Sequence, residues 1–482
     1  VVYDRAWVGE LQSTTPNVHV TLGTGTYPRE NGFLGFGWAA PQTRRTIDFR
    51  SLLANGGIDP VLRALPVPSV AARLHALYPN AVSIAASGHK DYAAVGLGGG
   101  AATYELYGRT VNHTFVPAFL TGHAPPPLTA AQRKALTLHT PLPMGAEDRW
   151  AVNYTLDVAL RTRPRLLMLN LPEIDSWGHW FGPDNRPIFT RLMQGVDADI
   201  GQIEDAYRRM GILDQTDFIL TADHSMMESR PANNWRDVWK AAGGQAAIAR
   251  ADPDGGAIWL KDPSGAKRLA KRLVALRPTH VEAVFYRSAQ GISYHYVQAS
   301  PMNWLIRPAV GTALRDLADT TAGRNGPDVW MLYREGYTTV PRNVKGTWKG
   351  THGGATWEVQ HIPLVIAGPG IQQGVHSEFA ARSIDIAPTM ENLLGLPAIH
   401  RDGVLLADAL QDPTRAQLDA QNAVAPRLSE DVSALQAQSQ LDLTIKGHWP
   451  KPPTPIFRCH LPPSWAKNTI INCTPAVPPT NS

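Results

Sequence analysis

Short runs of apolar residues, each followed by polar residues, recur along the chain and predict buried strands. The clearest runs are Leu166–Leu171, Phe218–Thr221 and Ile362–Ala367. Uninterrupted apolar runs of this length are typical of parallel strands that are covered on both faces. Between them, apolar residues recur at helical spacing, as in Ile188–Met210. This alternation predicts a doubly wound α/β sheet, whose functional groups lie at the carboxyl ends of its strands.

Two long segments interrupt the alternation, and we expect them to be cap insertions in a catalytic domain that spans residues 1–410. Residues 38–148 are rich in Gly, Pro and Ala. Residues 228–347 contain three further strand-like runs, namely Ala257–Leu260, Glu282–Tyr286 and Val329–Leu332. Residues 411–482 follow as one helix and then a Pro-rich tail from Trp449, in which no packed element is expected.

Composition and charge exclude several classes of protein. With 43% hydrophobic and 18% charged residues the chain can bury a large core. No apolar run approaches the roughly 20 residues that a membrane-spanning helix needs, so we expect a soluble protein without a membrane span. The net charge of +4 is not gathered into Lys/Arg blocks, which argues against a nucleic-acid partner. The sequence begins at Val1 without Met or an apolar leader, as expected of a processed product or a fragment.

The sequence contains two cysteines, Cys459 and Cys473, both in the Pro-rich tail. A pair in this position fits one disulfide better than a metal site. The sequence leaves open whether the disulfide forms.

The first segment with candidate chemistry joins a buried strand to a helical turn. Leu166–Leu171 is followed by Asp175 and His179, and one turn of helix places residues four apart on the same side. A carboxylate and a neutral imidazole together suit a zinc-like ion. Taken alone, this spacing is more typical of a surface helix.

Two further segments repeat this arrangement. Phe218–Thr221 is followed by Asp223 and His224, while His352 is followed by two glycines that allow a tight turn. Each of these alone is typical of a capping Asp or an exposed loop His. Together with the first segment they supply two Asp and three His, the ligands that two adjacent divalent metals require. Such a site can hold the attacking and leaving oxygens of a phosphoryl displacement.

The segment Ser13–Gly25 is the best candidate for a nucleophile. Pro16 suits the first turn of a helix, and Thr15 suits its N-cap. Backbone N–H groups at a helix N-terminus favour an anion, so a phosphate can lie there while metal coordination lowers the pKa of the Thr hydroxyl. An ordinary helix N-cap is the alternative interpretation.

The order of these motifs resembles the alkaline phosphatase superfamily, and within it the type I phosphodiesterase and nucleotide pyrophosphatase branch. The resemblance runs from about Ser13 to Leu406 and includes Thr15-Pro16 with Thr24-Gly25 nine residues on. The other matching segments are Asp175 to His179, Ala222 to His224, Thr351 to Gly354, Pro363 to Gly370 and Asp385 to Thr389. It implies a three-layer α/β/α sandwich with a mostly parallel central sheet and cap insertions.

The resemblance also implies a role for each site residue and two divalent metal ions, most simply Zn²⁺. The implied ligand sets are Asp175, His179 and His352 for one zinc, and Asp223, His224 and Thr15 for the other. Thr15 is implied to attack phosphorus and to form a covalent phospho-threonine intermediate. The spelling Thr-x-Pro-Asn of many relatives favours Thr14 instead, whereas counting back from Thr24 without a gap favours Thr15.

One ligand of the family has no counterpart in this sequence. The second zinc of the family also takes an Asp from the end of the first sheet strand, well upstream of the nucleophile. Asp4 is too close to Thr15 and follows no convincing strand. We therefore expect the first strand and this ligand to be missing. A truncated or inactive member that binds metal or ligand without turnover is accordingly an alternative.

The implied substrate-binding residues are Lys90, Phe36 and Tyr92. Many relatives place an Asn where Phe36 stands, and monoester-cleaving relatives place a second cation where Tyr92 stands. A phosphate monoester carries about one more negative charge than a diester and needs those polar groups. The two aromatic residues therefore favour a diester, with the rings stacking on a base or another flat leaving group.

We expect a hydrolase that cleaves phosphodiester or nucleotide pyrophosphate bonds of a small nucleotide-like or headgroup-like substrate. A phosphomonoesterase or a phosphonate hydrolase of the same superfamily is the alternative. Relatives with two zincs are commonly exported, so the resemblance implies a secreted or periplasmic protein.

Overall fold

A computed structural model describes residues 1–55, 58–63, 65–120, 122–228, 230–231, 247–252, 256–275, 281–297, 308–338, 349–445, 457–460 and 472–475. Its helices are α1 (Thr15–Thr24), α2 (Pro28–Asn31), α3 (Phe49–Ala54), α4 (Ile58–Arg63), α5 (Val70–Leu77), α6 (Asp91–Gly98), α7 (Ala130–Ala135), α8 (Ala146–Thr162), α9 (Glu173–Phe181), α10 (Arg186–Arg209), α12 (Ala266–Ala275), α13 (Pro308–Asp319), α14 (Trp357–Gln360), α15 (Ile386–Leu393) and α16 (Arg415–Ile445). Short 3-10 helices are η1 (Leu213–Gln215), η3 (Pro263–Gly265), η5 (Ser383–Asp385) and η6 (Ala407–Ala409).

The first large sheet has five strands in the order β7-β6-β5-β4-β8. Their bounds are β4 (Ser83–Ser87), β5 (Tyr104–Val111), β6 (Thr114–Phe119), β7 (Leu138–His139) and β8 (Leu166–Asn170). β4 runs parallel to both β5 and β8, whereas β6 and β7 continue the sheet in antiparallel pairs. β8 is one edge of this sheet among the described residues.

The second sheet has four strands in the order β20-β1-β19-β9. Their bounds are β1 (Val2–Tyr3), β9 (Phe218–Thr221), β19 (Leu364–Ala367) and β20 (His376–Ser377). β19 is antiparallel to both β1 and β9. Phe218–Thr221 and Ile362–Ala367 were both expected to be parallel strands, but they pair antiparallel with each other. The expectation was wrong because an apolar run marks burial but not strand direction.

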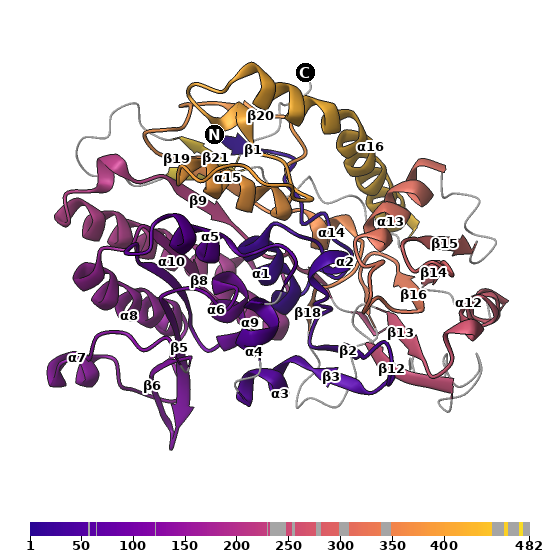
Figure 1. The fold of residues 1–482 in the computed structure, drawn as a ribbon, viewed down its shortest axis with the longest axis horizontal. Helices are drawn as coiled ribbons and strands as arrows, with labels where there is room; N and C mark the ends of the chain where they lie inside the picture. Colours follow the sequence, from indigo (N-terminus) through magenta and orange to yellow (C-terminus); the bar gives the residue numbers. More distant parts are fainter. Residues whose placement is uncertain are drawn as a thin grey trace.

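Helices cover both faces of these two sheets (Figure 1). On one face, residues of α1, α5, α6 and α15 share an apolar core with residues of β4, β8 and β19. On the other face, Trp150 and Tyr154 of α8 pack against Ile84 and Leu106 of the five-stranded sheet, and α10 packs on α8. The expected three-layer α/β/α arrangement is therefore confirmed, and it brings the ends of β8 and β9 to one site.

A separate five-stranded sheet lies on the right of Figure 1. Its order is β12-β13-β16-β14-β15, with bounds β12 (Ile248–Asp252), β13 (Ala257–Leu260), β14 (Val281–Arg287), β15 (Tyr294–Val297) and β16 (Val329–Tyr333). α12 packs on it through Leu269 and Leu273. The three strand-like runs expected within residues 228–347 are thus present, and the role of this segment as a cap stays a prediction.

The segment 38–148 is divided differently from the expected insertion. β4 and β5 lie within it, yet both pair in the main sheet next to β8. β4 was not predicted as a strand because Ser83–Ser87 is a short run with mostly small side chains, within a segment rich in Gly and Ala. The hairpin of β2 (Gly37–Ala39) and β3 (Thr46–Asp48), followed by α3, lies outside the main sheet.

The C-terminal region contains the expected helix, which is α16 with Pro426 inside it. The tail also holds β21 (Phe457–His460) and β22 (Asn472–Pro475), which pair and place Cys459 opposite Cys473. The expectation of no packed element there was wrong at these residues, because the prolines of the tail fall outside the paired strands except for Pro475 at the end of β22. The disulfide stays a prediction.

Small paired strands complete the fold, namely β10 (Met227–Glu228) with β18 (Gly350–Thr351) and β11 (Arg230–Pro231) with β17 (Tyr337–Thr338). Among the helices that the structure describes, none combines the length and the apolar character that crossing a membrane requires.

Candidate metal and nucleophile site

Asp175 and His179 lie one turn apart on α9, which follows β8. The helix is fixed at its start by a reciprocal pair of hydrogen bonds with α8. The backbone N–H of Glu173 donates to the Asp148 carboxylate, and the backbone N–H of Asp148 donates to the Glu173 carboxylate, both at 3.1 Å. Because acceptors of this kind stabilise a helix N-terminus, Asp148 and Glu173 set the direction in which α9 presents its two site residues.

The other site residues follow two further strands. Asp223 and His224 come directly after β9, and His352 comes directly after β18. β10 pairs with β18, so the chain after His224 lies beside the chain before His352. The two imidazole rings stack with centroids 3.6 Å apart. The glycine turn expected after His352 is confirmed, since Gly353 and Gly354 both have positive φ.

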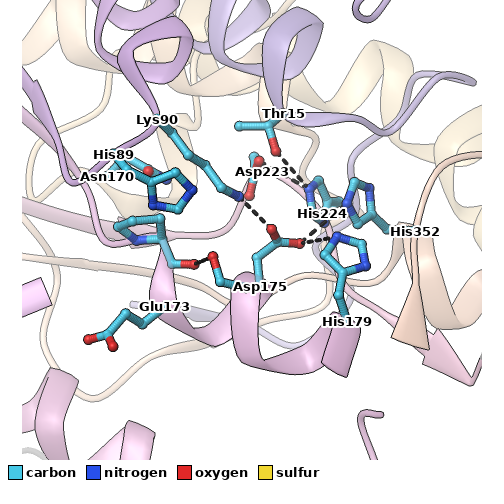
Figure 2. A network of polar contacts seen from close by, with 12 residues as sticks. Thr15, His89, Lys90, Asn170, Glu173, Asp175, His179, Asp223, His224 and His352 are labelled. Atoms are coloured by element: carbon cyan, nitrogen blue, oxygen red, sulfur yellow. Dashed lines mark hydrogen bonds and ion pairs between the residues drawn. The ribbon is translucent and has the colours of Figure 1, made fainter. Parts of the chain in front are cut away.

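All three histidines present the same ring nitrogen to the site (Figure 2). The Nδ1 of each lies 2.9 to 3.2 Å from a backbone carbonyl oxygen, that of Gly350, Ser225 or Ser13. A carbonyl oxygen can only accept, so Nδ1 carries the proton of the neutral ring and Nε2 keeps its lone pair. Backbone carbonyls orient metal-binding histidines in this way.

Asp175 lies at the centre of one group of ligand atoms. Its Oδ1 is 3.4 Å from the Nε2 of His179 and 3.3 Å from the Nε2 of His352. The ligand atoms of these three residues all lie within 4.8 Å of one another. Oδ1 is buried and has no hydrogen-bond partner within the part of the chain that the structure describes. Because a carboxylate oxygen and two ring lone pairs converge without a proton between them, these residues fit a divalent cation.

Thr15, Asp223 and His224 form a second group beside the first. The Oγ1 of Thr15 lies 3.3 Å from the Nε2 of His224, and that nitrogen lies 3.2 Å from Asp223. His19, one turn after Thr15 on α1, donates from Nδ1 to the Thr15 carbonyl oxygen at 2.8 Å and lies 3.6 Å from Asp223. The structure therefore brings together all six residues of the two expected ligand sets.

The helix that carries the candidate nucleophile begins at Thr15, and its N-cap is Thr14. The expectation that Thr15 is the N-cap was wrong by one residue, because both threonines fit the pattern of a polar residue before a helix. The Thr14 hydroxyl donates a hydrogen bond to the Oδ1 of Asn17 at 2.5 Å, so it is engaged by another residue of the first helical turn. Only Thr15 of these two directs its hydroxyl to His224 in the described contacts.

The electrostatics of the site favour charged carboxylates, and they favour neutral imidazoles at His179 and His352, whose pKa values burial lowers. Burial also opposes the charged form of His224, but Asp223 outweighs it and raises the pKa of this imidazole. Burial opposes ionisation of Asp175, but Lys90 and the histidines outweigh it and hold its pKa well below the ordinary value. Burial also opposes ionisation of Asp223, whose pKa the nearby His224 lowers. Burial lowers the pKa of His352 to about 4. Such a set is ready to bind a cation at neutral pH.

Lys90 enters the site from the start of α6. It is buried, and its Nζ donates to the Oδ2 of Asp175 at 2.5 Å. Figure 2 shows Lys90 on the opposite side of Asp175 from His179, His224 and His352. Two residues further, the Tyr92 ring contacts Phe36 edge to face with centroids 5.2 Å apart. The structure thus places all three expected substrate-binding residues in one neighbourhood.

Two residues in this neighbourhood were missed in the sequence analysis. His19 shares a helix face with Thr15, and the spacing of four residues was the available signal. Arg50 of α3 lies over the rings of Phe36 and Tyr92, and no local pattern predicts that contact.

Asp4 and Glu10 are the two carboxylates that precede the nucleophile segment. The Oδ2 of Asp4 lies 3.0 Å from the Nδ1 of His376. The expectation that no strand precedes Asp4 was wrong, because β1 (Val2–Tyr3) is too short to form a recognisable sequence pattern before its pairing is known. The expected loss of an upstream metal ligand stays a prediction.

The sequence matches one known family over most of its length. The model of the type I phosphodiesterase / nucleotide pyrophosphatase family matches residues 10–355. A segment of 84 residues is 33% identical to an uncharacterized pyrophosphatase/phosphodiesterase of Schizosaccharomyces pombe. That segment covers 17% of this chain and 16% of the yeast protein.

Solved structures show the same fold at low sequence identity. The alkaline phosphatase PafA aligns with a TM-score of 0.63 at 15% identity, covering 85% of this chain and 92% of that chain. Human ectonucleotide pyrophosphatase / phosphodiesterase 5 aligns with a TM-score of 0.55 at 14% identity, covering 84% and 91%. An inactive murine form of that protein, in complex with AMP, aligns with a TM-score of 0.54 at 14% identity, covering 83% and 88%.

Proposed function

Since this chain belongs to the type I phosphodiesterase / nucleotide pyrophosphatase family, we propose that it hydrolyses phosphodiester or nucleotide pyrophosphate bonds with Thr15 as the nucleophile. The observation that carries the proposal is the position of the Thr15 hydroxyl at the start of α1, 3.3 Å from His224 and beside the convergent ligand atoms of Asp175, His179 and His352.

The five carboxylate and imidazole side chains would hold two divalent cations, which we expect to be Zn²⁺. Asp175, His179 and His352 would bind one, while Asp223 and His224 with the Thr15 oxygen would bind the other. When bound, such ions lower the pKa of the hydroxyl and neutralise charge on the phosphoryl oxygens.

The chain's own groups would position the phosphoryl group and the nucleophile for the reaction. The phosphoryl oxygens lie at the N-terminus of α1, where the helix dipole favours negative charge. The Thr15 oxygen forms a bond to phosphorus as the bond from phosphorus to the leaving-group oxygen breaks. The hydroxyl proton passes to solvent, and the leaving group departs as its anion. Water then cleaves the phospho-threonine ester, which releases the phosphoryl product and restores the hydroxyl.

Lys90 and the aromatic pair would select the substrate. The buried Lys90 ammonium offers charge-assisted hydrogen bonds to a phosphoryl oxygen. The half-buried Phe36 ring, which the buried Tyr92 ring supports edge to face, would offer apolar surface beside it for a nucleobase or another flat group. The AMP bound to a murine relative with this fold supports a nucleotide-like substrate. These features favour a diester over a monoester.

Metal content by elemental analysis, combined with hydrolysis of bis-p-nitrophenyl phosphate and p-nitrophenyl phosphate, tests the proposal. We expect two zinc equivalents per chain and faster turnover of the diester. A preference for the monoester would identify a phosphomonoesterase, for which the fold similarity to PafA is an argument. Bound metal without turnover of either substrate would identify an inactive, ligand-binding member. A secreted or periplasmic location is proposed on the ectonucleotide relatives and on the Cys459–Cys473 pair.

A further inference from the structure

Arg50 of α3 is held over the two aromatic rings beside the site. Its guanidinium carbon lies 4.7 Å from the centroid of the Phe36 ring and 5.7 Å from the centroid of the Tyr92 ring. Both distances are within the range of a cation–π contact. The contact joins segments that are far apart in sequence, since Phe36 precedes the β2–β3 hairpin and Tyr92 lies on α6. Arg50 therefore has a defined position despite being exposed.

The guanidinium retains its hydrogen-bond donors in this position. A cation–π contact uses the face of the group, whereas its N–H donors lie along the edge in a fork that matches phosphate or carboxylate oxygens. Among the described residues, no carboxylate lies within 4 Å of Arg50, and no hydrogen bond engages its side chain. Asp91 acts on it only at longer range. An exposed fork with a fixed orientation is thus available to an anionic ligand.

Tyr92 connects Arg50 to the reaction centre. Its ring contacts Arg50 directly, and the charges of Lys90, Asp175 and Arg50 all act on its hydroxyl. Lys90 is 4% exposed and Tyr92 is 8% exposed, while Arg50 lies at the surface. The two cations therefore follow one another from the buried site outward, separated by the Tyr92 side chain.

We propose that Arg50 binds a second, non-reacting phosphate of the substrate. This inference rests on the proposed function. The rings hold the guanidinium face, the fork binds the second phosphate, and Thr15 attacks the phosphorus next to it. A diester with one phosphate leaves Arg50 unused.

The test compares two diester-type substrates in the zinc-loaded protein. One is P1,P2-di(adenosine-5′) pyrophosphate, and the other is the p-nitrophenyl ester of thymidine 5′-monophosphate. We expect Arg50→Gln to lower kcat/KM for the pyrophosphate by about 10- to 100-fold, the effect of losing hydrogen bonds to a charged group. The kcat/KM for the ester should change less than about 3-fold, since ordinary surface substitutions have effects of this size. Arg50→Lys should recover only part of the loss, because it keeps the charge without the fork.

Arg45→Gln is the matched control, because Arg45 is an exposed arginine on the same segment, between β2 and β3. This substitution should leave kcat/KM unchanged for both substrates. Equal losses on both substrates in Arg50→Gln would overturn the proposal and show that Arg50 only orders the two rings. Unchanged kinetics on both would overturn it as well.

A binding measurement separates this inference from the proposed function. Calorimetric titration of the Thr15→Ala protein with inorganic pyrophosphate and with inorganic phosphate requires no turnover. We expect pyrophosphate to bind more tightly, and the difference to disappear when Arg50→Gln is added but to persist with Arg45→Gln. If the protein hydrolyses neither substrate but shows this binding pattern, the proposed function is wrong and the Arg50 subsite stands. If the difference survives in Arg50→Gln, the subsite fails.

Discussion

The two adjacent threonines at the start of α1 are expected to respond in opposite ways to substitution. Thr15→Ala removes the proposed nucleophile, and loss of a nucleophile lowers kcat by about 10⁴-fold or more in well-studied hydrolases. The Thr15 hydroxyl contacts only the His224 ring within the described residues, at 3.3 Å, so we expect a stability change below about 1 kcal/mol.

Thr14→Ala removes a different contact. The buried Thr14 hydroxyl donates to Asn17 at 2.5 Å, and Asn17 in turn is fixed to the Glu10 carboxylate at 2.5 Å. Losing one buried hydrogen bond costs about 1 kcal/mol, so the free energy of unfolding should fall by roughly that amount. Because Thr14 does not face the site, kcat should stay within about 10-fold of the wild type, a loss of less than about 1.4 kcal/mol of transition-state stabilisation.

Steady-state hydrolysis of bis-p-nitrophenyl phosphate and urea unfolding, measured on the same preparations, check both expectations. Thr15→Ser keeps a hydroxyl at the position and should retain measurable turnover. An active Thr15→Ala protein beside an inactive Thr14→Ala protein would refute the assignment of the nucleophile.

Further predictions concern the metal ligands and their support. His352→Gln should remove one of two zinc equivalents by elemental analysis, whereas His361→Gln, outside the ligand set, should keep both. Burial raises the pKa of Glu10 from 4.5 to about 8, so the folded state keeps a proton that the unfolded chain releases. The free energy of unfolding should therefore fall by a few kcal/mol as pH rises from about 4.5 to 8, and Glu10→Gln should abolish this dependence in urea titrations. Asp148→Ala removes the acceptor at the start of α9 and should cost about 1 kcal/mol of stability, with zinc affinity lowered about 10-fold in a chelator competition. Unchanged affinity would show that α9 is positioned by other contacts.

The sequence predicted the ligand-bearing elements well because their signals are local. The apolar runs before Asp175 and Asp223 correspond to β8 and β9, and the helical spacing of Asp175 and His179 corresponds to α9. Each of these elements is specified by residues that are neighbours in the chain.

Local sequence patterns could not predict the features that depend on contacts between distant segments of the chain. The antiparallel direction of β19 depends on its pairing with β9, and burial alone does not encode it. The small-residue strand β4 carries too little apolar character to be recognised before its pairing with β8 is known. Arg50 contacts Phe36 and Tyr92 only in the folded chain, so its place near the site followed from the structure alone.

The pairing of β1 has a consequence for biosynthesis. Val2 pairs with Val365 of β19 and with His376 of β20, so the chain's first strand finds its partners only after residue 376 has been made. At about 5–20 residues per second, ribosomal synthesis separates these events by roughly 20–75 s. During that interval Val1 and Tyr3, which are buried in the finished fold, lack their final neighbours. The second sheet therefore forms late in synthesis, and His352 joins the histidine cluster in the same closing stage.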